Sequence, residues 1–251
     1  MYDIREAEAL LDPVARVYGI NTRWLRVRTA DYFGGLGFHG QTILEIGAGN
    51  GLYACALAAL GAQRVVALEP EGDGSRRGVI ERLRERAGEL RLDNLEVYPV
   101  ALQAYKAAPC TFDLIYMLAV INHLDEQAVQ LLHYDSESRA RYSQLLRPVY
   151  TWLRPGGRLV ISDVSRAHPY RPLIRLGLLK RHPFQPAIEW EKHQRPDVWQ
   201  QVLAQAGFVD IAVHWATNWR YPWLPKALVD NVIAAYLYAS LFVLSARRPH
   251  D

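Results

Sequence analysis

Short runs of aliphatic and β-branched residues alternate with amphipathic stretches along most of the chain. The short runs predict strands at residues 42–46, 64–68, 95–98, 112–118, 158–162, 209–215 and 241–246. The amphipathic stretches predict helices at residues 52–60, 76–91, 126–153 and 196–206, with a turn at 154–157. This alternation predicts an α/β fold with a mainly parallel sheet and helices on both faces.

Two segments fall outside this alternation. Residues 1–40 are predicted to form a helical N-terminal cap, and residues 164–195 form a Pro- and Arg-rich insertion after the fifth strand. We expect both to cover the carboxyl edge of the sheet, where open α/β sheets bind ligands. The chain is then one domain, with a core at residues 41–163, a substrate-side insertion at 164–195 and the C-terminal part of the sheet at 196–251.

The insertion contains the strongest local charge asymmetry of the chain. From residue 164 to residue 188 there are five Arg or Lys residues and no acid. Three interpretations stay open at this point. The segment can be a lid that recruits an anionic acceptor, a membrane-surface contact, because residues 172–179 are partly apolar, or a plain solvated basic face.

Composition excludes several classes of protein. Of the 251 residues, 50% are hydrophobic and 22% are charged, which excludes a disordered or low-complexity chain. The net charge of +3 is too small to predict a nucleic-acid partner. Two cysteines, Cys55 and Cys110, are too few for a disulfide framework, and we expect both to be buried in a reducing compartment. The spacing of His, Asp and Glu predicts no metal site.

The sequence predicts neither export nor a membrane span. The N-terminus carries acids where a signal peptide needs an apolar core. The longest apolar run near the C-terminus, residues 232–244, is shorter than the roughly 20 residues of a transmembrane helix. We interpret this run as buried core. We therefore expect a cytoplasmic protein without a transmembrane segment, either a monomer or a homodimer formed through the N-terminal helices.

The most informative motif is a glycine-rich turn, which follows a predicted strand and opens a predicted helix. Gly47, Gly49 and Gly51 allow the backbone to turn tightly and to approach a ligand closely. The N-terminus of the following helix offers free N–H donors. A dinucleotide-binding motif needs its third glycine where this chain has Leu52, which disfavours a nicotinamide-dependent oxidoreductase.

Two acids accompany this turn. Glu69 ends the next predicted strand, where a carboxylate can accept hydrogen bonds from both hydroxyls of a ribose. Glu45 precedes the first glycine, a position that is usually apolar in NAD-binding turns. It is well placed for a positively charged part of a ligand.

With these residues in place, the chain resembles the class I S-adenosylmethionine (SAM) dependent methyltransferases of the Rossmann-like, small-molecule type. The resemblance rests on LEIGAGNG (44–51), VVALEPE (65–71), FDLIYMLAVINHLDE (112–126), LRPGGRLVISD (153–163) and AGF (206–208). It implies a seven-stranded, mostly parallel sheet whose antiparallel last strand, here 241–246, lies between the fifth and sixth strands. It also implies SAM as cofactor and S-adenosylhomocysteine as product.

The resemblance assigns cofactor-binding roles to matching positions. Gly47, Gly49 and Gly51 would approach the methionine and ribose parts of SAM, and Glu45 would lie near the methionine ammonium. Glu69 would hold the ribose hydroxyls, with Pro70 beside the adenine. These roles are expectations carried over from the family pattern.

The adenine and methyl-transfer sides depart more from the family. Many members have an acidic residue after the third strand, where this chain has Ala101 and Leu102. Leu102 could pack on the adenine, and Gln103 could replace the hydrogen bond of the missing acid. Ala119 would line the methyl-transfer side after the fourth strand.

Several polar residues near strand ends are candidates for the acceptor side. His193, His123 and Asp163 are candidate bases or catalytic contacts, because a base helps to remove the proton of a hydroxyl nucleophile. Asn122 could orient either a substrate or His123, and Asp163 could instead cap a helix or pair with Arg166. The candidate substrate-binding residues are Asn122, Glu189, Trp190 and Arg166. The aromatic segment 218–225 could also line an acceptor pocket.

The prediction is a SAM-dependent methyltransferase that acts on a small organic acceptor, at oxygen. A glycan, a lipid-linked compound or a phosphorylated metabolite is the alternative acceptor, in keeping with the basic insertion. A non-catalytic SAM-binding protein is a further alternative. An RNA methyltransferase is disfavoured, because the chain has neither an RNA-binding module nor an Asn/Asp-Pro-Pro-aromatic turn after the fourth strand.

Overall fold

The computed structural model describes residues 3–71, 77–183, 187–215, 225, 228 and 230–250. The chain divides into two compact units. Unit 1 comprises residues 1–118, 151–160 and 248–251, and unit 2 comprises residues 119–150 and 161–247. Each unit is considered by itself below.

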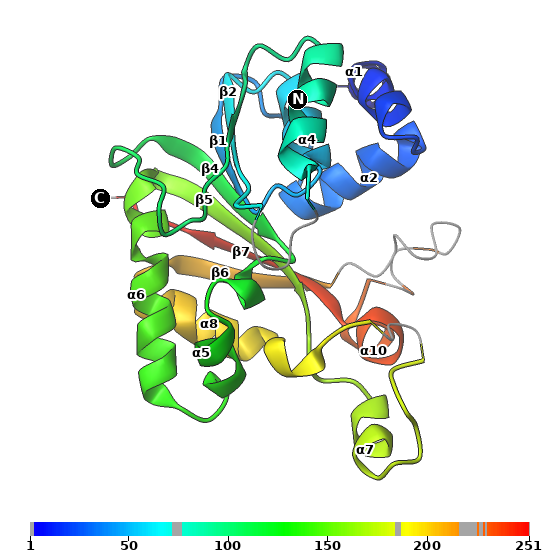
Figure 1. The fold of residues 1–251 in the computed structure, drawn as a ribbon, viewed down its shortest axis with the longest axis vertical. Coiled ribbons are helices and arrows are strands. Elements are labelled where there is room, and N and C mark those ends of the chain that lie inside the picture. Colours follow the sequence, from blue (N-terminus) through cyan, green and yellow to red (C-terminus); the bar gives the residue numbers. More distant parts are fainter. Residues whose placement is uncertain are drawn as a thin grey trace. The chain divides into compact units, whose positions relative to one another are not determined.

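Seven strands form one sheet in the order β3-β2-β1-β4-β5-β7-β6 (Figure 1). The strands are β1 (Thr42–Ile46), β2 (Arg64–Leu68), β3 (Leu95–Tyr98), β4 (Phe112–Leu118), β5 (Leu153–Val164), β6 (Val209–Trp215) and β7 (Leu241–Arg247). Strand β1 pairs in parallel with β2 and β4, and β7 pairs antiparallel with β6. The predicted Rossmann-like sheet, with its antiparallel last strand inserted before the sixth, is therefore confirmed.

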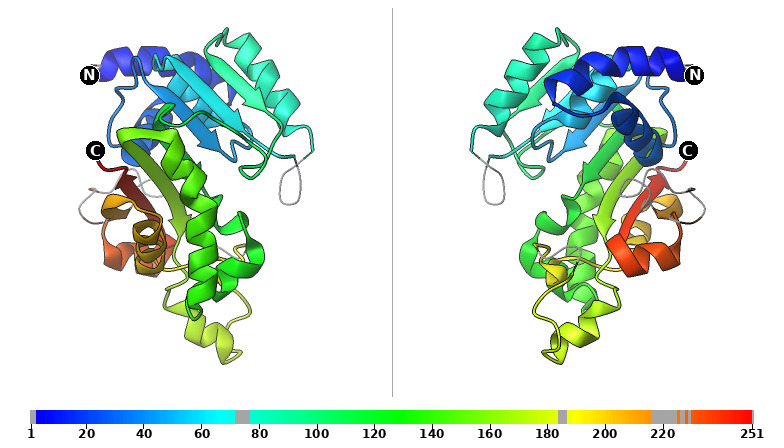
Figure 2. Two further views of the ribbon diagram at one scale, coloured as in Figure 1. Left: turned by 90° about the vertical axis from the view of Figure 1, so that its left-hand side faces the viewer. Right: turned by 90° about the vertical axis from the view of Figure 1, so that its right-hand side faces the viewer.

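Helices precede and connect these strands. They are α1 (Ile4–Val17), α2 (Thr22–Phe33), α3 (Leu52–Ala59), α4 (Val79–Glu89), α5 (Glu126–Leu131), α6 (Ser136–Trp152), α7 (Tyr170–Arg175), α8 (Pro196–Gln205) and α10 (Val232–Ala234). Short 3-10 turns lie at η1 (Ile121–His123) and η2 (Trp190–Lys192), and a single π turn, η4 (Ala235–Ala239), continues α10. Figure 2 shows the helices and strands of each unit from two further sides.

The N-terminal helices belong to the core of unit 1. Asn21 caps α2 by accepting a hydrogen bond from the Trp24 amide (3.0 Å), and Gly34 ends it in the left-handed conformation. At the end of α2, the Phe33 ring packs edge-on against the rings of Phe38 and Tyr116, with centroid distances of 5.7 and 4.9 Å. The helices predicted at residues 1–40 thus share their apolar contacts with β4.

Two predicted elements differ from those observed. The helix expected over 126–153 is two helices, α5 and α6, because Asp135 caps a new helix by accepting the Ser138 amide (2.8 Å). The turn expected at 154–157 lies inside β5. Gly156 adopts φ +74° there, and its amide donates to the carbonyls of Arg248 and Pro249, so the C-terminal segment pairs with this part of the strand.

Two burial expectations were also partly wrong. Cys55 is buried in α3, but Cys110 is exposed in a turn where its φ is +56°. The apolar run 232–244 buries its second half in β7, whereas Val232 and Ile233 at its start are exposed. Among the described side chains of α10 and η4, those of Ala234 and Ala235 are buried and the larger apolar ones are exposed, so apolar composition alone does not predict burial in this segment. Among the described residues, no helix is both long and apolar enough to cross a bilayer.

We expect Phe33→Ala to lower the free energy of unfolding of the protein by about 3–5 kcal/mol, since a large buried ring is lost from the aromatic cluster. Urea denaturation followed by circular dichroism measures this change. Tyr134→Ala is the matched control, because its ring is 74% exposed in unit 2, and we expect a change within about 0.5 kcal/mol. Equal effects of both substitutions would contradict a core role for the N-terminal helices.

Candidate functional site

The glycine turn joins the end of β1 to the start of α3 in unit 1. Gly47, Gly49 and Gly51 all have positive φ, at +72°, +52° and +75°. The amides of Gly47 and Ala48 donate to the carbonyl of Leu68 at 2.8 and 2.9 Å, which anchors the turn to the end of β2. The turn is thus held by backbone hydrogen bonds that need no side chain.

The glycines differ in what surrounds them. A Cβ on Gly51 would lie 1.9 Å from Cδ1 of the buried Leu83, so packing against α4 requires glycine there. A Cβ on Gly49 would meet no atom of the described residues within 4 Å. The space beside Gly49 is open, as a ligand that approaches the backbone closely needs it to be.

Glu69 connects the end of β2 to this turn. Its Oε2 accepts the Gly49 amide at 2.6 Å, and the residue is almost completely buried. A charge-assisted hydrogen bond of this length fixes both the carboxylate and the glycine backbone. Pro70, the predicted adenine contact, follows it and is exposed.

Glu45 is a buried carboxyl in the middle of the sheet. It lies on β1 with 3% of its surface exposed, and its Oε2 has no hydrogen-bond partner among the described residues. Burial raises the pKa of Glu45 to about 8. A neighbouring cation would relieve this cost by favouring the carboxylate, so the residue fits the ammonium of a methionine group.

Leu102 and Gln103 follow β3 in the same unit. Leu102 is buried, whereas Gln103 is exposed. Leu102 can therefore offer an apolar surface to an aromatic base, as predicted. Neither residue supplies the carboxylate that many family members have at this point, and the adenine contact stays a prediction.

Two residues that the sequence reasoning missed support the glycine turn. The Tyr18 hydroxyl, after α1, donates to the Asn50 carbonyl at 2.7 Å. Arg86 of α4 donates to the same carbonyl at 3.3 Å, and its guanidinium lies 4.2 Å from the Tyr18 ring centroid. No motif in the sequence marks these residues, because their role comes from the packing of α1 and α4 around the turn.

In unit 2, Ala119 follows β4 with an unusual backbone. Its φ is +57°, and its amide donates to the Ser162 carbonyl of β5 at 2.7 Å. A non-glycine residue in the left-handed region is uncommon, and such residues cluster at functional sites. The exposed Ala119 at this position is in keeping with its predicted place beside the transferred methyl group.

The structure brings together two predicted catalytic residues of unit 2. Asp163 near the end of β5 and His193 after η2 lie with Oδ1 and Nδ1 2.8 Å apart, and Asp163 is 1% exposed. The carboxylate therefore pairs with His193 and not with Arg166, the alternative considered from the sequence. A histidine whose Nδ1 faces a buried carboxylate has its tautomer and orientation fixed, which leaves Nε2 for proton transfer.

Arg166, three residues after Asp163, is a buried cation. Among the described residues, its side chain forms one hydrogen bond, from Nη1 to Oε1 of the buried Gln194 at 3.4 Å, and its Nε has no partner. Burial, followed by the charge of Arg171, lowers its pKa. No described carboxylate pairs with Arg166. A buried guanidinium without a paired carboxylate favours the binding of an anion, because the anion neutralises its charge.

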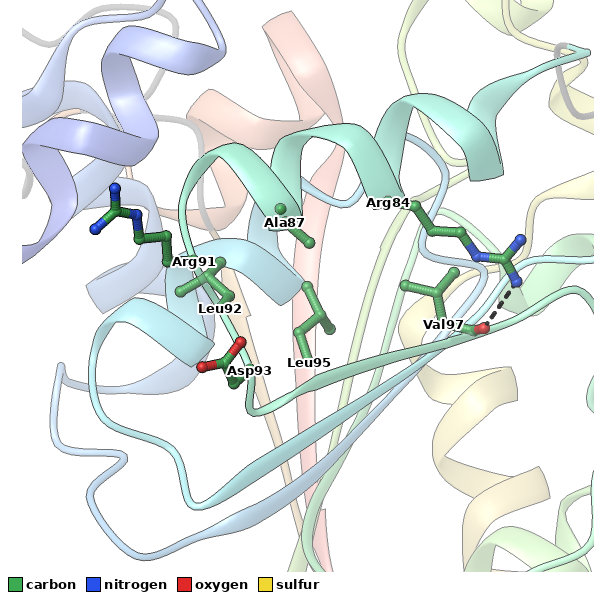
Figure 3. A pocket seen from close by; sticks show the side chains of 8 residues that line it. Arg84, Ala87, Arg91, Leu92, Asp93, Leu95 and Val97 are labelled. Atoms are coloured by element: carbon green, nitrogen blue, oxygen red, sulfur yellow. Dashed lines mark hydrogen bonds between the residues drawn. The ribbon is translucent and has the colours of Figure 1, made fainter.

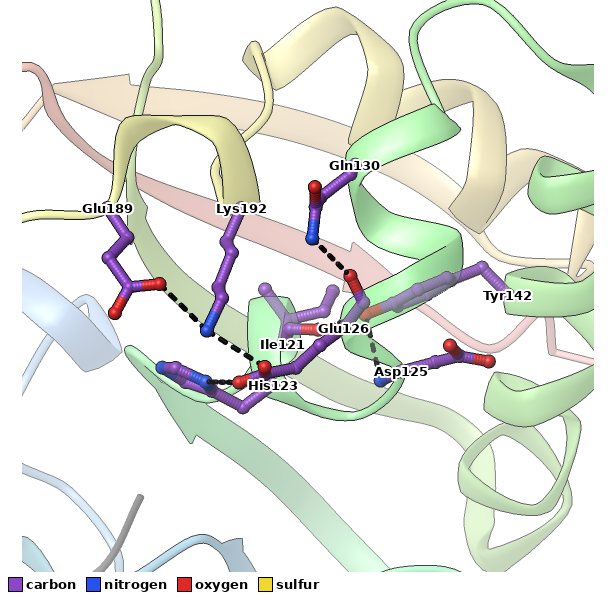
Figure 4. Close-up of polar contacts among 8 residues, drawn as sticks. All are labelled: Ile121, His123, Asp125, Glu126, Gln130, Tyr142, Glu189 and Lys192. Carbon is purple, nitrogen blue, oxygen red and sulfur yellow. Dashed lines mark hydrogen bonds and ion pairs between the residues drawn. The ribbon is translucent and has the colours of Figure 1, made fainter. Parts of the chain in front are cut away.

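His123 lies in a chain of ion pairs rather than in a buried site (Figure 4). Its Nδ1 is 2.8 Å from Oε1 of Glu126, and Lys192 joins Oε2 of Glu126 to Glu189, both at 2.8 Å. These hydrogen bonds from Lys192 and His123 lower the pKa of Glu126. Because half of the His123 side chain is exposed, the network favours a positioning role for His123 and Glu189.

Asn122 and Trp190 lie in more buried surroundings. Asn122 in η1 is buried, and its Oδ1 has no partner among the described residues. The Trp190 ring stacks on His182 with a centroid distance of 4.7 Å and lies 4.3 Å from His168. The predicted aromatic segment at 218–224 lies outside the described residues.

The structure also has a pocket that the sequence did not predict. It has a volume of about 580 Å³, lies between α4 and β3, and is lined in part by Arg84, Arg91 and Asp93 (Figure 3). None of the predicted site residues lines it. Among the described residues, no group of three or more His, Cys, Asp or Glu side chains could hold a metal ion.

Comparisons with known proteins identify the family and the fold. A family model for a methyltransferase domain matches residues 21–213. A SAM-dependent methyltransferase from Mesorhizobium loti has 18% identity and a TM-score of 0.56, with coverage of 84% of this chain and 93% of its own. One from Aquifex aeolicus has 15% identity and a TM-score of 0.58, with coverage of 93% and 97%. No curated protein sequence matches.

The fold is shared more widely than one reaction. The [4+2]-cyclase SpnF has 14% identity and a TM-score of 0.58, with coverage of 96% of this chain and 93% of its own. At these identities the solved structures show the fold alone, and the family match decides the class. The chain belongs to the methyltransferase-domain family. It is a SAM-dependent methyltransferase.

We expect Glu45→Gln to weaken SAM binding at least about tenfold, because an amide cannot neutralise an ammonium.

The same substitution should stabilise the protein without cofactor. The pKa of Glu45 is raised from 4.5 to about 8 in the folded protein, so the folded state keeps the proton over this range while the unfolded chain loses it. The free energy of unfolding of wild type is therefore highest at low pH and falls as the pH rises from about 4.5 to about 8. The gain in Tm of Glu45→Gln should therefore grow over this window. Calorimetry with SAM measures the loss of affinity, and thermal unfolding at several pH values measures the gain in Tm. Glu89→Gln, an exposed residue of α4, is the control, and equal pH profiles of both variants would contradict the assignment.

We expect Gly49→Ala and Gly51→Ala to separate binding from folding. Each substitution costs about 1–2 kcal/mol for the left-handed backbone. Gly51→Ala also collides with Leu83 and should lose about 1–3 kcal/mol more, whereas Gly49→Ala should fold and lose SAM affinity at least about tenfold. Urea unfolding and calorimetry give the two quantities. Undiminished SAM affinity in a folded Gly49→Ala protein would show that the cofactor lies elsewhere.

Proposed function

We propose that the protein transfers the methyl group of SAM to an oxygen atom of a small organic acceptor that carries an anionic group. The observation that carries this proposal is the buried pair of Asp163 and His193, with 2.8 Å between Oδ1 and Nδ1. A base held in one orientation by a buried carboxylate is what a hydroxyl nucleophile needs, since a hydroxyl must lose its proton on methylation. An acceptor amine needs such a base less, because its nitrogen lone pair can attack the methyl group before a proton is lost.

The roles of the two residues follow from their contact. Nδ1–H of His193 donates to Asp163, and Nε2 takes the proton of the acceptor hydroxyl as its oxygen forms the new bond to carbon. When bound, SAM supplies an electrophilic methyl group on a positively charged sulfur, and S-adenosylhomocysteine remains after the transfer. Asp163 stabilises the imidazolium that forms, and the proton later leaves to water.

In this proposal the cofactor is held by residues of unit 1, and the role proposed for Ala119 on the methyl-transfer side is the one that the resemblance gives it. Gly47, Gly49 and Gly51 admit the methionine and ribose parts. The contacts proposed for the remaining groups are those of Glu45 with the ammonium, Glu69 with the ribose hydroxyls, and Pro70, Leu102 and Gln103 with the adenine. The open space at Gly49 and the unpartnered Oε2 of Glu45 support this assignment. The 251 residues then act as one methyltransferase domain.

The anionic group of the acceptor is proposed from Arg166. A buried guanidinium that, among the described residues, bonds only to a neutral amide is costly, and an acceptor carboxylate or phosphate would offset that cost through charge-assisted hydrogen bonds. Asn122, with its buried and unpartnered Oδ1, is proposed to donate or accept a further hydrogen bond. Trp190 and the ion-paired Glu189 and His123 complete the acceptor side as positioning residues.

A second candidate acceptor is a phosphorylated, glycan or lipid-linked compound. The basic segment after β5 favours it, because Arg171, Arg175 and Arg181 form no ion pair with a described carboxylate. Under this alternative their neutralisation raises the KM for the acceptor steeply. Under the first proposal it leaves KM within about twofold, because Arg166 alone meets the anion.

We expect His193→Asn to reduce kcat by about 100- to 10,000-fold while SAM affinity stays within about threefold. The assay follows transfer of radiolabelled methyl from SAM across a panel of hydroxylated carboxylic acids and their amino analogues. Added imidazole should restore part of the activity of His193→Asn.

The matched control is His214→Asn, because His214 lies exposed on β6. It should keep the wild-type rate. Full turnover in His193→Asn would overturn the assignment of the base, and methylation of the amines alone would overturn the choice of oxygen. Failure of the wild-type protein to bind SAM in calorimetry would contradict both the assignment of His193 as the base and the choice of oxygen.

A further inference from the structure

Unit 2 displays apolar side chains that no part of its core uses. In α7 and the turn that follows it, Leu176 and Leu178 are 72% and 69% exposed, and Leu173 is also exposed. None of the residues of α7 is buried. This helix therefore contributes nothing to the apolar core, and its sequence is not explained by folding.

A second group of exposed apolar residues lies in α10 and η4, which a hydrogen bond links to the start of α7. Val232, Ile233, Tyr236 and Leu237 of α10 and η4 are all exposed. The Tyr170 hydroxyl at the start of α7 donates to the Leu237 carbonyl at 3.2 Å, which joins the two segments. Exposed apolar side chains gathered on two linked segments are typical of a binding surface.

Basic residues alternate with the leucines of α7. Arg171, Arg175, Lys180 and Arg181 lie within the same dozen residues, and the chain has no acid from 164 to 188. No ion pair joins any of the four to a described carboxylate. The cations are thus left for an external anionic surface.

The loop that carries these residues is anchored at its base. His168 and His182, on either side of it, are buried with their rings 4.6 Å apart, and both contact the Trp190 ring. Figure 1 shows α7 at the end of unit 2, away from its strands. A short helix held at both ends can present its outer residues without the core rearranging.

We propose that this surface, defined as residues 170–181 together with 232–237 and called the α7 surface, binds the face of an anionic lipid bilayer. The headgroup layer supplies the anions for the four cations, and the underlying acyl boundary accepts the exposed leucines. A protein partner would need a groove or an extended apolar face, and a six-residue helix interleaved with cations offers neither. The inference is independent of the methyl acceptor.

The test is sedimentation of the purified full-length protein with vesicles of phosphatidylcholine alone and with about 30% phosphatidylglycerol. We expect binding to the anionic vesicles that weakens as salt is raised, and little binding to phosphatidylcholine. The triple variant Arg175→Gln, Lys180→Gln, Arg181→Gln should lose on the order of 100-fold in partition coefficient, at about fivefold for each charge. The double variant Leu176→Ser, Leu178→Ser should lose at least about tenfold.

Matched controls remove the same kinds of side chain from other exposed positions. Arg5→Gln, Arg23→Gln, Arg91→Gln lowers the net charge equally, and Leu131→Ser, Tyr134→Ser removes exposed apolar area from α5 and its turn. Both controls should bind anionic vesicles like wild type, and all variants should keep the wild-type Tm and SAM affinity.

Three results would overturn the proposal. The first is equal binding of wild type to both kinds of vesicle. The second is a loss confined to the charge variant, because the exposed leucines would then have no part in it. The third is self-association of the protein in sedimentation equilibrium that Leu176→Ser, Leu178→Ser abolishes, because a second copy would then be the occupant of the α7 surface.

Discussion

The hydrogen bond from the Gly49 amide to the Glu69 carboxylate holds together the part of unit 1 to which we assign cofactor binding. It joins the turn after β1 to the end of β2 at 2.6 Å. With the carbonyl of Leu68 accepting the amides of Gly47 and Ala48, it fixes the backbone before any ligand arrives. A preformed site of this kind loses little conformational freedom on binding. Tyr18 and Arg86 add support from the outer helices through one carbonyl, that of Asn50.

Next to this ordered turn lies a group that costs the fold free energy. Glu45 is surrounded by apolar strands and has a pKa of about 8, so the protein without cofactor retains it largely in its neutral form. The sequence places an acid where packing would favour an aliphatic residue. Under the proposed function the ammonium of SAM compensates for this cost when it is bound, so that binding is retained at the expense of stability.

The sequence predicted the sheet well because its signals are local. The runs of β1, β2 and β4 and the glycine spacing each lie within a few residues, and the strand order came with the family resemblance. The cap at Asp135 that divides α5 from α6 is a local signal that was overlooked. By contrast, the roles of Tyr18 and Arg86, the exposure of Cys110 and the ion pair between Lys192 and Glu126 depend on residues distant in the chain. No single-sequence pattern carries that information. The contact between Asp163 and His193 was expected only as two separate candidates.

The rings of His168, His182 and Trp190 close the base of the α7 loop, while α7 itself buries no residue. We therefore expect substitutions of the exposed leucines and cations of this loop to change the free energy of unfolding of unit 2 only slightly. The loop can diverge faster than the strands and can be exchanged between relatives as a cassette. If the α7 surface binds membranes as proposed, the site of the protein in the cell can change during evolution while its catalytic core stays under purifying selection.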